Sequence, residues 1–407
     1  MTLEGHNKPA QSTAVFIVVM ALMAIGLVMV ASTSASLDRS SFTWPLWRTP
    51  FGRQMVFVLV GFAVMIVTSR LVMPLLASPE MRRRTSQVAF VIAVACLIAV
   101  LIPSLASPHR GSHRWLRLAI GGMDIGFQPS ELAKLAMVAI VASLLTERGA
   151  DPRSFRRCFL PASIAIAVCV LLVGMEDFGT AALLAGIGVA MLFVAGCRLR
   201  HLSVLSAIGA CGLTVLLYAV PYRLARLTAY KELWEDPQGK GYQPLQSLTT
   251  IASGGWLGTG LGSGVQKYGY LPESRTDFIF AVICEELGMF GGALVIGLFC
   301  ALVWLGLRAM LAAPSRFERL LAFGLTATIG LQSAMNIAVV TVVTPTTGIS
   351  LPLISAGGSS LLTFCLALGV LAAISARGNK MASLSLEADA SARGAVGVAR
   401  MGDATAW

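Results

Sequence analysis

Ionisable side chains that could do chemistry gather in a polar stretch past the middle of an otherwise apolar chain. Arg223 and Arg226 stand three residues apart, a spacing that can clamp phosphate oxygens. Asp277 stands at the start of the next apolar run, where a carboxylate can act as a general base. Helix capping by Thr276 or Asp277 would also explain an acid at this place. The stretch therefore predicts phosphate binding and proton transfer, with capping as the structural alternative.

Two further carboxylates, Glu285 and Glu286, lie inside the same apolar run, about two helical turns deeper than Asp277. Capping does not explain acids at that depth. The run holds no obvious counter-ion, and charges inside a membrane segment are costly unless they have partners. We therefore expect partners on other helices, or a wet cavity.

A glycine-rich stretch, 254–267, comes before Asp277 and ends in Lys267. Its Gly-x-Gly-x-Gly spacing resembles a dinucleotide-binding loop, but no strand precedes it and no helix begins on it. We reject that interpretation. A flexible backbone that approaches a ligand closely is the better prediction.

Two smaller polar clusters come earlier in the chain. Arg114 precedes the first, in which Glu131 and Lys134 are three residues apart and share one helical face. Two interpretations stay open for this pair: an ion pair that neutralises itself so that a polar helix can insert, or a charged wall of a substrate cavity. The second cluster, at Asp177, indicates a solvated turn whose Asp caps the next helix.

The composition identifies a membrane protein. Of 407 residues, 56% are hydrophobic and 13% charged, against about 25% charged in soluble domains, and the mean hydropathy is +0.77. This excludes a cytosolic enzyme, a nucleic-acid binder and a secreted domain. The net charge of +11 is typical of basic cytoplasmic loops. The eight cysteines show no C-x-x-C spacing, which argues against a zinc site or a disulfide framework.

The predicted fold class is an all-α polytopic membrane protein with ten transmembrane helices. The apolar runs long enough to cross a bilayer are 13–32, 54–76, 87–106, 129–146, 158–174, 180–196, 202–220, 278–307, 319–342 and 357–376. We interpret the first as an uncleaved span, because it is longer than a signal-peptide core.

Loop charge sets the predicted orientation. Lys and Arg are more frequent on the side that holds the termini, so both termini are expected in the cytoplasm. Residues 1–12 form a cytoplasmic head, 13–378 the membrane domain and 379–407 a disordered cytoplasmic tail. The longest loop, 221–276, lies between spans seven and eight on the extracytoplasmic side, where it offers the material for a site.

Motifs spread along the chain resemble those of one family. They are Arg53-Gln54, Arg114-Trp115, Gln128-Pro129-Ser130-Glu131 with Lys134, Asp177-Phe178-Gly179-Thr180, Gly254-Gly255, Leu271-Pro272-Glu273, Thr276-Asp277-Phe278, Glu285-Glu286-Leu287-Gly288, Asn336, Pro345, Gly348, Leu351-Pro352, Ile354-Ser355 and Gly357-Gly358-Ser359-Ser360. In this order on ten spans, the chain resembles the SEDS family of bacterial shape, elongation, division and sporulation proteins. The stretch from Gln266 to Glu273 is more similar to the division members than to the elongation members.

The resemblance implies a peptidoglycan glycosyltransferase that polymerises lipid II on the outer leaflet, with Asp277 as catalytic base. The cationic residues that would steady the leaving diphosphate are Arg114, Arg223, Arg226 and Lys267. The remaining candidate substrate-binding residues are Glu131, Lys134, Glu285 and Ser359. A single displacement would invert the anomeric centre, so that an α-linked donor gives a β-linked glycan.

The implied partners are lipid II, a class B penicillin-binding protein that cross-links the strands, and other membrane proteins of the division machinery, with no nucleic acid. The implied location is the bacterial cytoplasmic membrane at the division septum. No cofactor is predicted, and a divalent cation is left open. The alternatives are a lipid II flippase, an elongation polymerase and a scaffold without catalysis; the sequence shows no internal repeat of the kind that many transporters carry.

Overall fold

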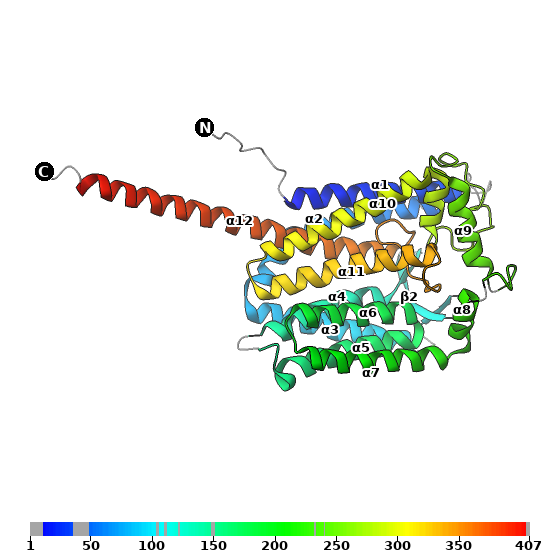
Figure 1. Cartoon of the computed structure of the whole chain (residues 1–407), viewed down its shortest axis with the longest axis horizontal. Helices are drawn as coiled ribbons and strands as arrows, with labels where there is room; N and C mark the ends of the chain where they lie inside the picture. Colours follow the sequence, from blue (N-terminus) through cyan, green and yellow to red (C-terminus); the bar gives the residue numbers. More distant parts are fainter. Residues whose placement is uncertain are drawn as a thin grey trace.

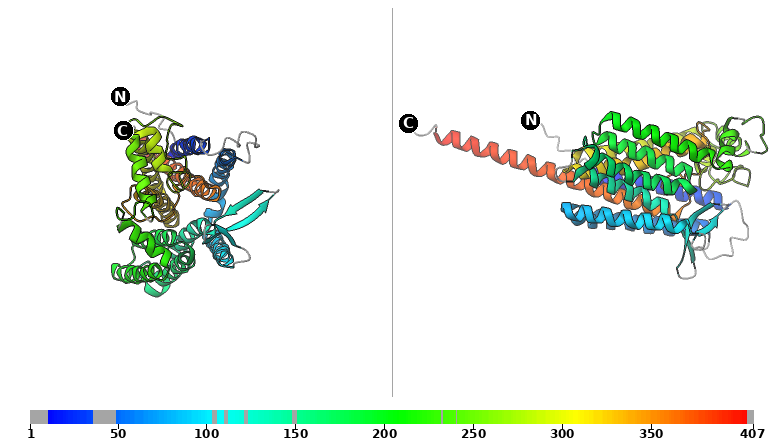
Figure 2. Two further views of the ribbon diagram at one scale, coloured as in Figure 1. Left: turned by 90° about the vertical axis from the view of Figure 1, so that its right-hand side faces the viewer. Right: turned by 90° about the horizontal axis from the view of Figure 1, so that it is seen from below.

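The computed structural model describes residues 11–35, 49–102, 106–109, 112–120, 123–147, 151–231, 233–239 and 241–403. Long helices run roughly parallel to one another and form one bundle (Figure 1). A small sheet and two short helices, α8 and α9, gather at one end of the bundle (Figures 1 and 2). The polar segments of the sequence therefore meet at a single end of the molecule.

Each predicted apolar run falls on a helix. These helices are α1 (Gln11–Ala35), α2 (Pro50–Ala77), α3 (Pro79–Val100), α4 (Pro129–Thr146), α5 (Leu160–Glu176), α6 (Phe178–Val194), α7 (Leu199–Tyr218), α10 (Ile279–Ala312), α11 (Arg316–Val340) and the first part of α12 (Gly358–Asp403). Within the described residues, nine helical segments are long and apolar enough to cross a membrane; α5 reaches that length together with the π-helix η3 (Phe155–Phe159), and α6 is shorter. The polytopic helical class is confirmed, and the number of ten crossings stays a prediction.

Helix starts follow local sequence rules. Ser78 is the N-cap of α3: its hydroxyl accepts a hydrogen bond from the backbone N–H of Met81 at 3.1 Å, and Pro79 occupies the first helical turn. Ser315 caps α11 in the same way through Glu318. Such caps satisfy backbone donors that have no partner inside the helix.

Glycines allow the helices to approach closely. Gly26 of α1 lies against the backbone of Ile354, and Gly324 of α11 lies against Val138 of α4, so that an added Cβ would clash at either glycine. In the apolar, membrane-spanning stretches of α4 and α12, 78% and 72% of the residues are buried, whereas in that of α7 only 6% are buried. The core of the bundle is thus built around α4 and α12, and α7 lies at its lipid-facing periphery.

A three-stranded antiparallel sheet stands before α4, and the sequence analysis did not predict it. Its strands are β1 (Ala106–His109), β2 (Ser112–Ile120) and β3 (Met123–Phe127), in the order β1-β2-β3. In the β2–β3 register, Leu116 pairs with Phe127 and Ile120 with Met123. The signal was present in the sequence, because Gly-Gly between two strand-like stretches is typical of a hairpin.

The segment predicted as a long flexible loop contains two helices, α8 (Pro221–Lys231) and α9 (Tyr242–Gly254). Arg223 and Arg226 therefore lie on a helix, and the expectation that they belong to a flexible loop is wrong. The reason is local: Leu224, Ala225 and the two arginines are good helix formers that follow a proline in the first turn.

The start of α1 and the end of α12 leave the bundle at the same end, opposite to α8 and α9 (Figure 1). An even number of crossings requires this arrangement. α12 continues as one helix to Asp403 and extends away from the bundle, through a segment for which the sequence predicted disorder. Alanine, which has the highest helix propensity, is frequent in that segment.

Candidate active site

Three charged side chains converge on Gly348, in the irregular segment between α11 and α12. A Cβ built on Gly348 would lie 3.7 Å from Oδ2 of Asp277, 3.8 Å from Nη1 of Arg114 and 3.8 Å from Nη1 of Arg226. The φ of Gly348 is +76°, a backbone conformation that favours glycine. One carboxylate and two guanidinium groups, brought from three distant parts of the chain, thus surround one point.

Asp277 precedes α10 and does not cap it. The N-cap of α10 is Phe278, which makes no side-chain capping hydrogen bond. The structural alternative, in which Thr276 or Asp277 is the cap, is therefore wrong. The half-buried carboxylate of Asp277 faces the point at Gly348, near the two guanidinium groups.

The backbone around Asp277 is fixed by one side chain of α11 and one side chain of the segment between α11 and α12. The side-chain amide of Asn336 donates to the carbonyl of Asp277 at 2.8 Å and to the carbonyl of Ile349 at 2.7 Å. Ser355 donates from its hydroxyl to the carbonyl of Thr276 at 2.6 Å. These bonds hold Asp277 and the segment that carries Gly348 in one fixed relation.

Arg114 comes from β2 and reaches the turn between α5 and α6. Its Nε donates to the carbonyl of Glu176 at 3.0 Å, and its Nη1 lies 3.2 Å from Oδ2 of Asp177. Asp177 also caps α6, accepting from the backbone N–H of Thr180 at 3.1 Å. The capping prediction for Asp177 is confirmed, but the turn is not solvated, because Asp177 is 3% exposed.

The two arginines of α8 have different partners. Nη1 of Arg226 donates to the carbonyl of Thr346 at 3.2 Å and also borders Gly348. Arg223 instead donates to the carbonyls of Leu216 and Met175, at 3.0 and 2.7 Å. The pair predicted to clamp one phosphate is therefore divided, with Arg226 at the site and Arg223 bracing the ends of α5 and α7.

Burial lowers the pKa of Arg223 below its ordinary value, and the nearby guanidinium of Arg114 lowers it further. The carboxylates of Asp177 and Glu176 act in the opposite direction and favour the charged form. Arg223 is thus a cation held close to a second cation, and the acidic turn compensates both charges.

Glu131 and Lys134 form the self-neutralising ion pair that was one of the two interpretations. Nζ of Lys134 lies 2.9 Å from Oε1 of Glu131, with side chains 2% and 6% exposed. Lys134 also donates to the side-chain oxygen of Gln332, whose own amide holds the carbonyl of Ser350 at 3.0 Å. The pair lies inside the bundle and supports the segment that leads from Gly348 to α12, instead of forming an open cavity wall.

Lys267 and Glu285 are buried away from Gly348. Lys267 forms an ion pair with Glu286 at 2.7 Å and is 2% exposed. Glu285 accepts hydrogen bonds from the backbone of Val265 and Gln266 in the glycine-rich stretch. Neither side chain is among the three that border Gly348, and the substrate-binding role expected for them stays a prediction.

Ser359 lies in the first turn of α12, 7% exposed, and its hydroxyl has no hydrogen-bond partner. Beside it, Gly358 packs against the ring of Phe57 of α2. No contact places Ser359 beside Asp277, so its expected substrate role stays a prediction. An unpaired buried hydroxyl is nevertheless unusual and marks a place where a ligand or water could bind.

No group of three or more His, Cys, Asp or Glu side chains that could hold a metal ion occurs among the described residues. One hollow, of about 470 Å³, is lined by residues that include Asp151 and Arg316, and Asp277 does not line it. A smaller hollow, about 20 Å³, lies beside Arg114 and Asp177 and has room for a single water.

Four residues of the site were not assigned a role there from the sequence. Gly348, Asn336 and Ser355 belong to the family motifs, but their contacts join segments that are far apart in sequence, and the motifs do not show which segments meet. Asp177 was interpreted only as a cap, although the pair that it forms with Arg114 joins the turn to the site.

Comparison with known proteins gives consistent relatives. The sequence model of the cell cycle protein family named for FtsW, RodA and SpoVE matches residues 12–380. Stage V sporulation protein E of Bacillus subtilis is 39% identical over 370 residues, which cover 91% of this chain and 98% of that protein. A probable peptidoglycan glycosyltransferase FtsW of Nitrosococcus halophilus is 38% identical over 373 residues, covering 90% and 92% of the two chains.

Solved structures share the fold. One chain belongs to a structure that describes structural coordination of polymerization and crosslinking by a peptidoglycan synthase complex; it is 26% identical, with a TM-score of 0.69 and coverage of 89% and 97%. The rod shape determining protein RodA of Thermus thermophilus is 24% identical, with a TM-score of 0.59 and coverage of 89% and 95%. The second likeness concerns the fold alone.

Proposed function

Because this chain belongs to the FtsW, RodA and SpoVE family of cell cycle membrane proteins, we propose that it is a peptidoglycan glycosyltransferase that polymerises lipid II at the outer face of the cytoplasmic membrane. The observation that carries the proposal is the convergence of Asp277, Arg114 and Arg226 on Gly348. A general base and a paired cationic site are the two parts that this transfer reaction requires.

The reaction joins a sugar hydroxyl to the anomeric carbon of a lipid-linked donor. The hydroxyl oxygen attacks that carbon, a new carbon–oxygen bond forms, and the bond to the diphosphate breaks. The proton of the hydroxyl passes to the carboxylate of Asp277, while the electrons of the broken bond stay on the polyprenyl diphosphate. Asp277 then releases its proton to water.

Arg114 and Arg226 hold the leaving diphosphate. Their Nη1 atoms border the same point as the Asp277 carboxylate, and guanidinium groups match phosphate oxygens in charge and geometry. Negative charge grows on the diphosphate as its bond breaks, so cations fixed in advance stabilise the transition state more than the ground state. Asp177 orients the guanidinium group of Arg114 through their ion pair.

The buried polar residues support this site from inside the bundle. Glu131 and Lys134 act through Gln332 on the segment that carries Gly348, and Arg223 braces the turn that contacts Arg114. We assign no direct substrate contact to Glu131, Lys134 or Arg223.

The division role, the partner and a metal complete the proposal. Relatives that carry the name FtsW favour septal synthesis over elongation, and the class B penicillin-binding protein follows from the neighbour described as coordinating polymerization and crosslinking. Other membrane proteins of the division machinery would bind the same complex. If the reaction uses a divalent cation, the carboxylate of Asp277 and the diphosphate oxygens would hold it, and it would supply positive charge to the leaving group, because guanidinium groups cannot ligate a metal.

Purified protein with lipid II in detergent, with products sized on a gel, tests the activity. Glycan ladders that form with and without a chelator indicate a polymerase that needs no divalent cation. Ladders that form only without the chelator indicate a polymerase that requires one. Scrambling of lipid II in liposomes without ladders would instead support the flippase alternative.

A further inference from the structure

The membrane helix α10 is interrupted at Gly288, whose φ and ψ are 70° and −170°. In an unbroken helix, the N–H groups of Met289 and Phe290 would donate to carbonyls of the preceding turn. Here Met289 donates to the carbonyl of Gly255 at 2.9 Å, and Phe290 donates to that of Trp256 at 3.4 Å. The glycine-rich stretch therefore provides the acceptors that the break removes.

The same stretch also provides the missing donors. The carbonyl of Glu285 accepts from the N–H of Thr259 at 2.9 Å, and the carbonyl of Glu286 accepts from that of Gly260 at 3.0 Å. Both sides of the break are thus paired by residues 254–267, which we call the splint. Backbone groups inside a membrane protein must be satisfied internally, and the splint does so at this break.

Close contact with α10 explains why the splint is rich in glycine. A Cβ on Gly254 would collide with the carbonyl of Cys284, and a Cβ on Gly258 would collide with the carbonyl of Glu286. The expectation from the sequence, a flexible backbone that approaches a ligand, is therefore replaced by a backbone that approaches a helix of the same chain.

The carboxylates inside α10 bind the splint as well. Oε1 of Glu285 accepts from the N–H groups of Val265 and Gln266 at 2.8 and 3.2 Å. Oε2 of Glu286 accepts from the N–H of Gly262 at 3.0 Å. The two acids that capping could not explain are partners of this one segment.

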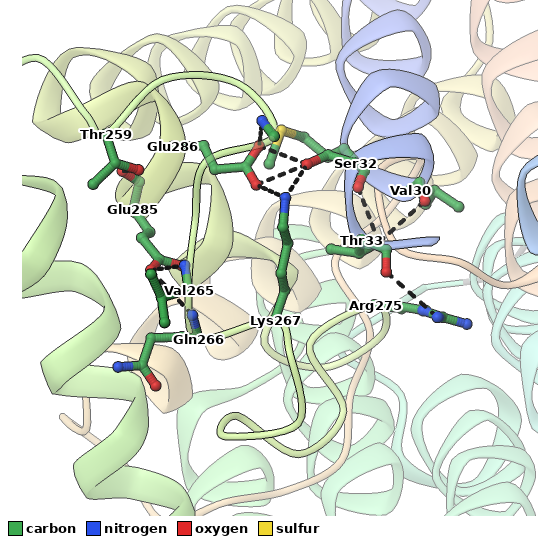
Figure 3. A network of polar contacts seen from close by, with 12 residues as sticks. Val30, Ser32, Thr33, Thr259, Val265, Gln266, Lys267, Arg275, Glu285 and Glu286 are labelled. Atoms are coloured by element: carbon green, nitrogen blue, oxygen red, sulfur yellow. Dashed lines mark hydrogen bonds and ion pairs between the residues drawn. The ribbon is translucent and has the colours of Figure 1, made fainter. Parts of the chain in front are cut away.

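Lys267 closes the network and joins it to α1 (Figure 3). Its Nζ lies 2.7 Å from Oε1 of Glu286 and 2.8 Å from the hydroxyl of Ser32, and that hydroxyl donates to Glu286 at 2.7 Å. The side chains of Lys267 and Glu286 are 1% and 0% exposed. A buried charge pair with this many hydrogen bonds is costly to break, because either partner alone is an uncompensated charge.

The outer segment of α10, residues 279–287 before the break, connects this network to the site. Asp277 lies just before the start of this segment, and the splint is bonded to its other end. So short a helix has little stability of its own and takes its orientation from what it is attached to. The last turn of α1 also reaches Arg275, which donates to the carbonyl of Thr33 at 3.4 Å (Figure 3).

We propose that Lys267 and Glu286 are a positioning pair: by locking the splint to α10 and α1, they fix the outer segment of α10 and therefore the direction of the Asp277 carboxylate. The inference rests on the proposed function for its catalytic consequence. It assigns Lys267 to the interior scaffold and not to the diphosphate.

The test compares Lys267→Met, Glu286→Gln and the double variant with the wild type, in the full-length protein in detergent with its penicillin-binding partner. Arg377→Met is the control for the loss of an ion pair elsewhere: Arg377 is 33% exposed and pairs at 3.0 Å with the buried Glu318, which also lies 3.7 Å from Arg82. Turnover and the half-saturating concentration of lipid II are measured on folded protein, and hydrogen exchange is followed by mass spectrometry over residues 255–290.

Lys267→Met is expected to lower turnover at least tenfold, to change half-saturation less than twofold, and to speed exchange in residues 255–290. The double variant should recover turnover and protection relative to Lys267→Met, because it removes both charges together. Arg377→Met should lower the melting temperature while keeping turnover and protection in this region.

Several outcomes would overturn the assignment. A rise in half-saturation at unchanged turnover would make Lys267 a substrate contact. If Lys267→Met speeds hydrogen exchange in residues 255–290 but keeps normal turnover, the splint has no positioning role. If hydrogen exchange in Lys267→Met is unchanged, the Lys267–Glu286 pair does not hold the splint to α10 and α1. If the wild type makes no glycan, the proposed function fails, and the exchange measurement separately decides whether the lock exists.

Discussion

The side-chain amide of Asn336 donates a hydrogen bond to the backbone carbonyl of Asp277 across 2.8 Å. Asn336 lies in α11 and is 0% exposed, and the same amide holds the carbonyl of Ile349, next to Gly348. One side chain thus fixes the distance between the proposed base and the segment around which the arginines gather. This geometry makes Asn336 a positioning residue.

Asn336→Leu keeps a similar volume but leaves two buried carbonyls without their donor. We expect a loss of about 1–3 kcal/mol in stability, by the cost of buried unsatisfied groups, and a fall in polymerisation turnover. Thr328→Val is the control: Thr328 is equally buried on the same helix but bonds only within it, to the carbonyl of Gly324 at 2.8 Å. Melting temperature and glycan yield check both variants; equal effects would deny Asn336 a special role.

Arg226→Ala and Arg223→Ala should now behave differently. Arg226 borders Gly348, so its loss should weaken lipid II use, seen as a higher half-saturating concentration, with the fold intact. Arg223 donates to the carbonyls of Leu216 and Met175, so its loss should lower the melting temperature more than it lowers lipid II affinity. If Arg223→Ala and Arg226→Ala lower the affinity for lipid II equally, the two arginines bind phosphate together, as their spacing suggested.

Much of the architecture could be predicted because membrane helices are coded locally. The runs that became α4 and α6 were found within a few residues of their ends, since about 20 apolar residues are needed for a span and charges or prolines mark its limits. Asp277, Arg114 and Arg226 were selected as candidates from residue type, and the first two also from family motifs; the structure brings the three side chains together around Gly348, and their roles stay predictions.

What could not be predicted depends on contacts between distant segments. The position of Lys267 in a predicted polar loop suggests a cation that is available to substrate, yet its side chain is buried against Glu286 and Ser32. Arg223 and Arg226 share a spacing but point to different partners. The position of a charge in the sequence does not tell whether its counter-charge comes from substrate or from another helix.

Breaking the ion pair in α4 should show that a lone buried charge is the costly species. Lys134→Met alone leaves Glu131 charged inside the bundle, and is expected to harm folding more than Lys134→Met combined with Glu131→Gln. Membrane yield and thermal stability check this. If the double variant folds but makes no glycan, the pair has a substrate role after all; if each single variant behaves as wild type, both interpretations are wrong.

Gly348→Ala should reduce polymerisation by filling the point at which the three charged groups meet. The added Cβ would lie 3.7–3.8 Å from Asp277, Arg114 and Arg226, and the positive φ adds about 1–2 kcal/mol of strain. Gly196→Ala is a matched control, because Gly196 has a φ of +88° and open space around it. Both variants should lose similar stability in thermal melts, and only Gly348→Ala should lose glycan yield. Full activity in Gly348→Ala would place the reaction elsewhere.

Asp277→Asn is the most direct test of the mechanism. Because Phe278 is the N-cap of α10, the substitution removes no helix cap, and the carbonyl that Asn336 holds belongs to the backbone and is unchanged. An aspartate that served only as a helix cap or through its backbone should therefore tolerate asparagine. A general base should not, since the amide cannot accept the hydroxyl proton, and loss of such proton transfer costs roughly 10²–10⁴-fold in rate.

We expect Asp277→Asn to insert into membranes, to melt near the wild-type temperature and to co-purify with the proposed penicillin-binding partner as the wild type does, while glycan ladders fall below detection. Asp236→Asn serves as the control: Asp236 lies in the same outer segment and accepts from the backbone N–H of Gly239 at 3.0 Å, which asparagine can also do. That variant should polymerise normally. Near-normal ladders from Asp277→Asn would remove Asp277 as the base, whereas failure of the variant to accumulate in membranes would make its role structural.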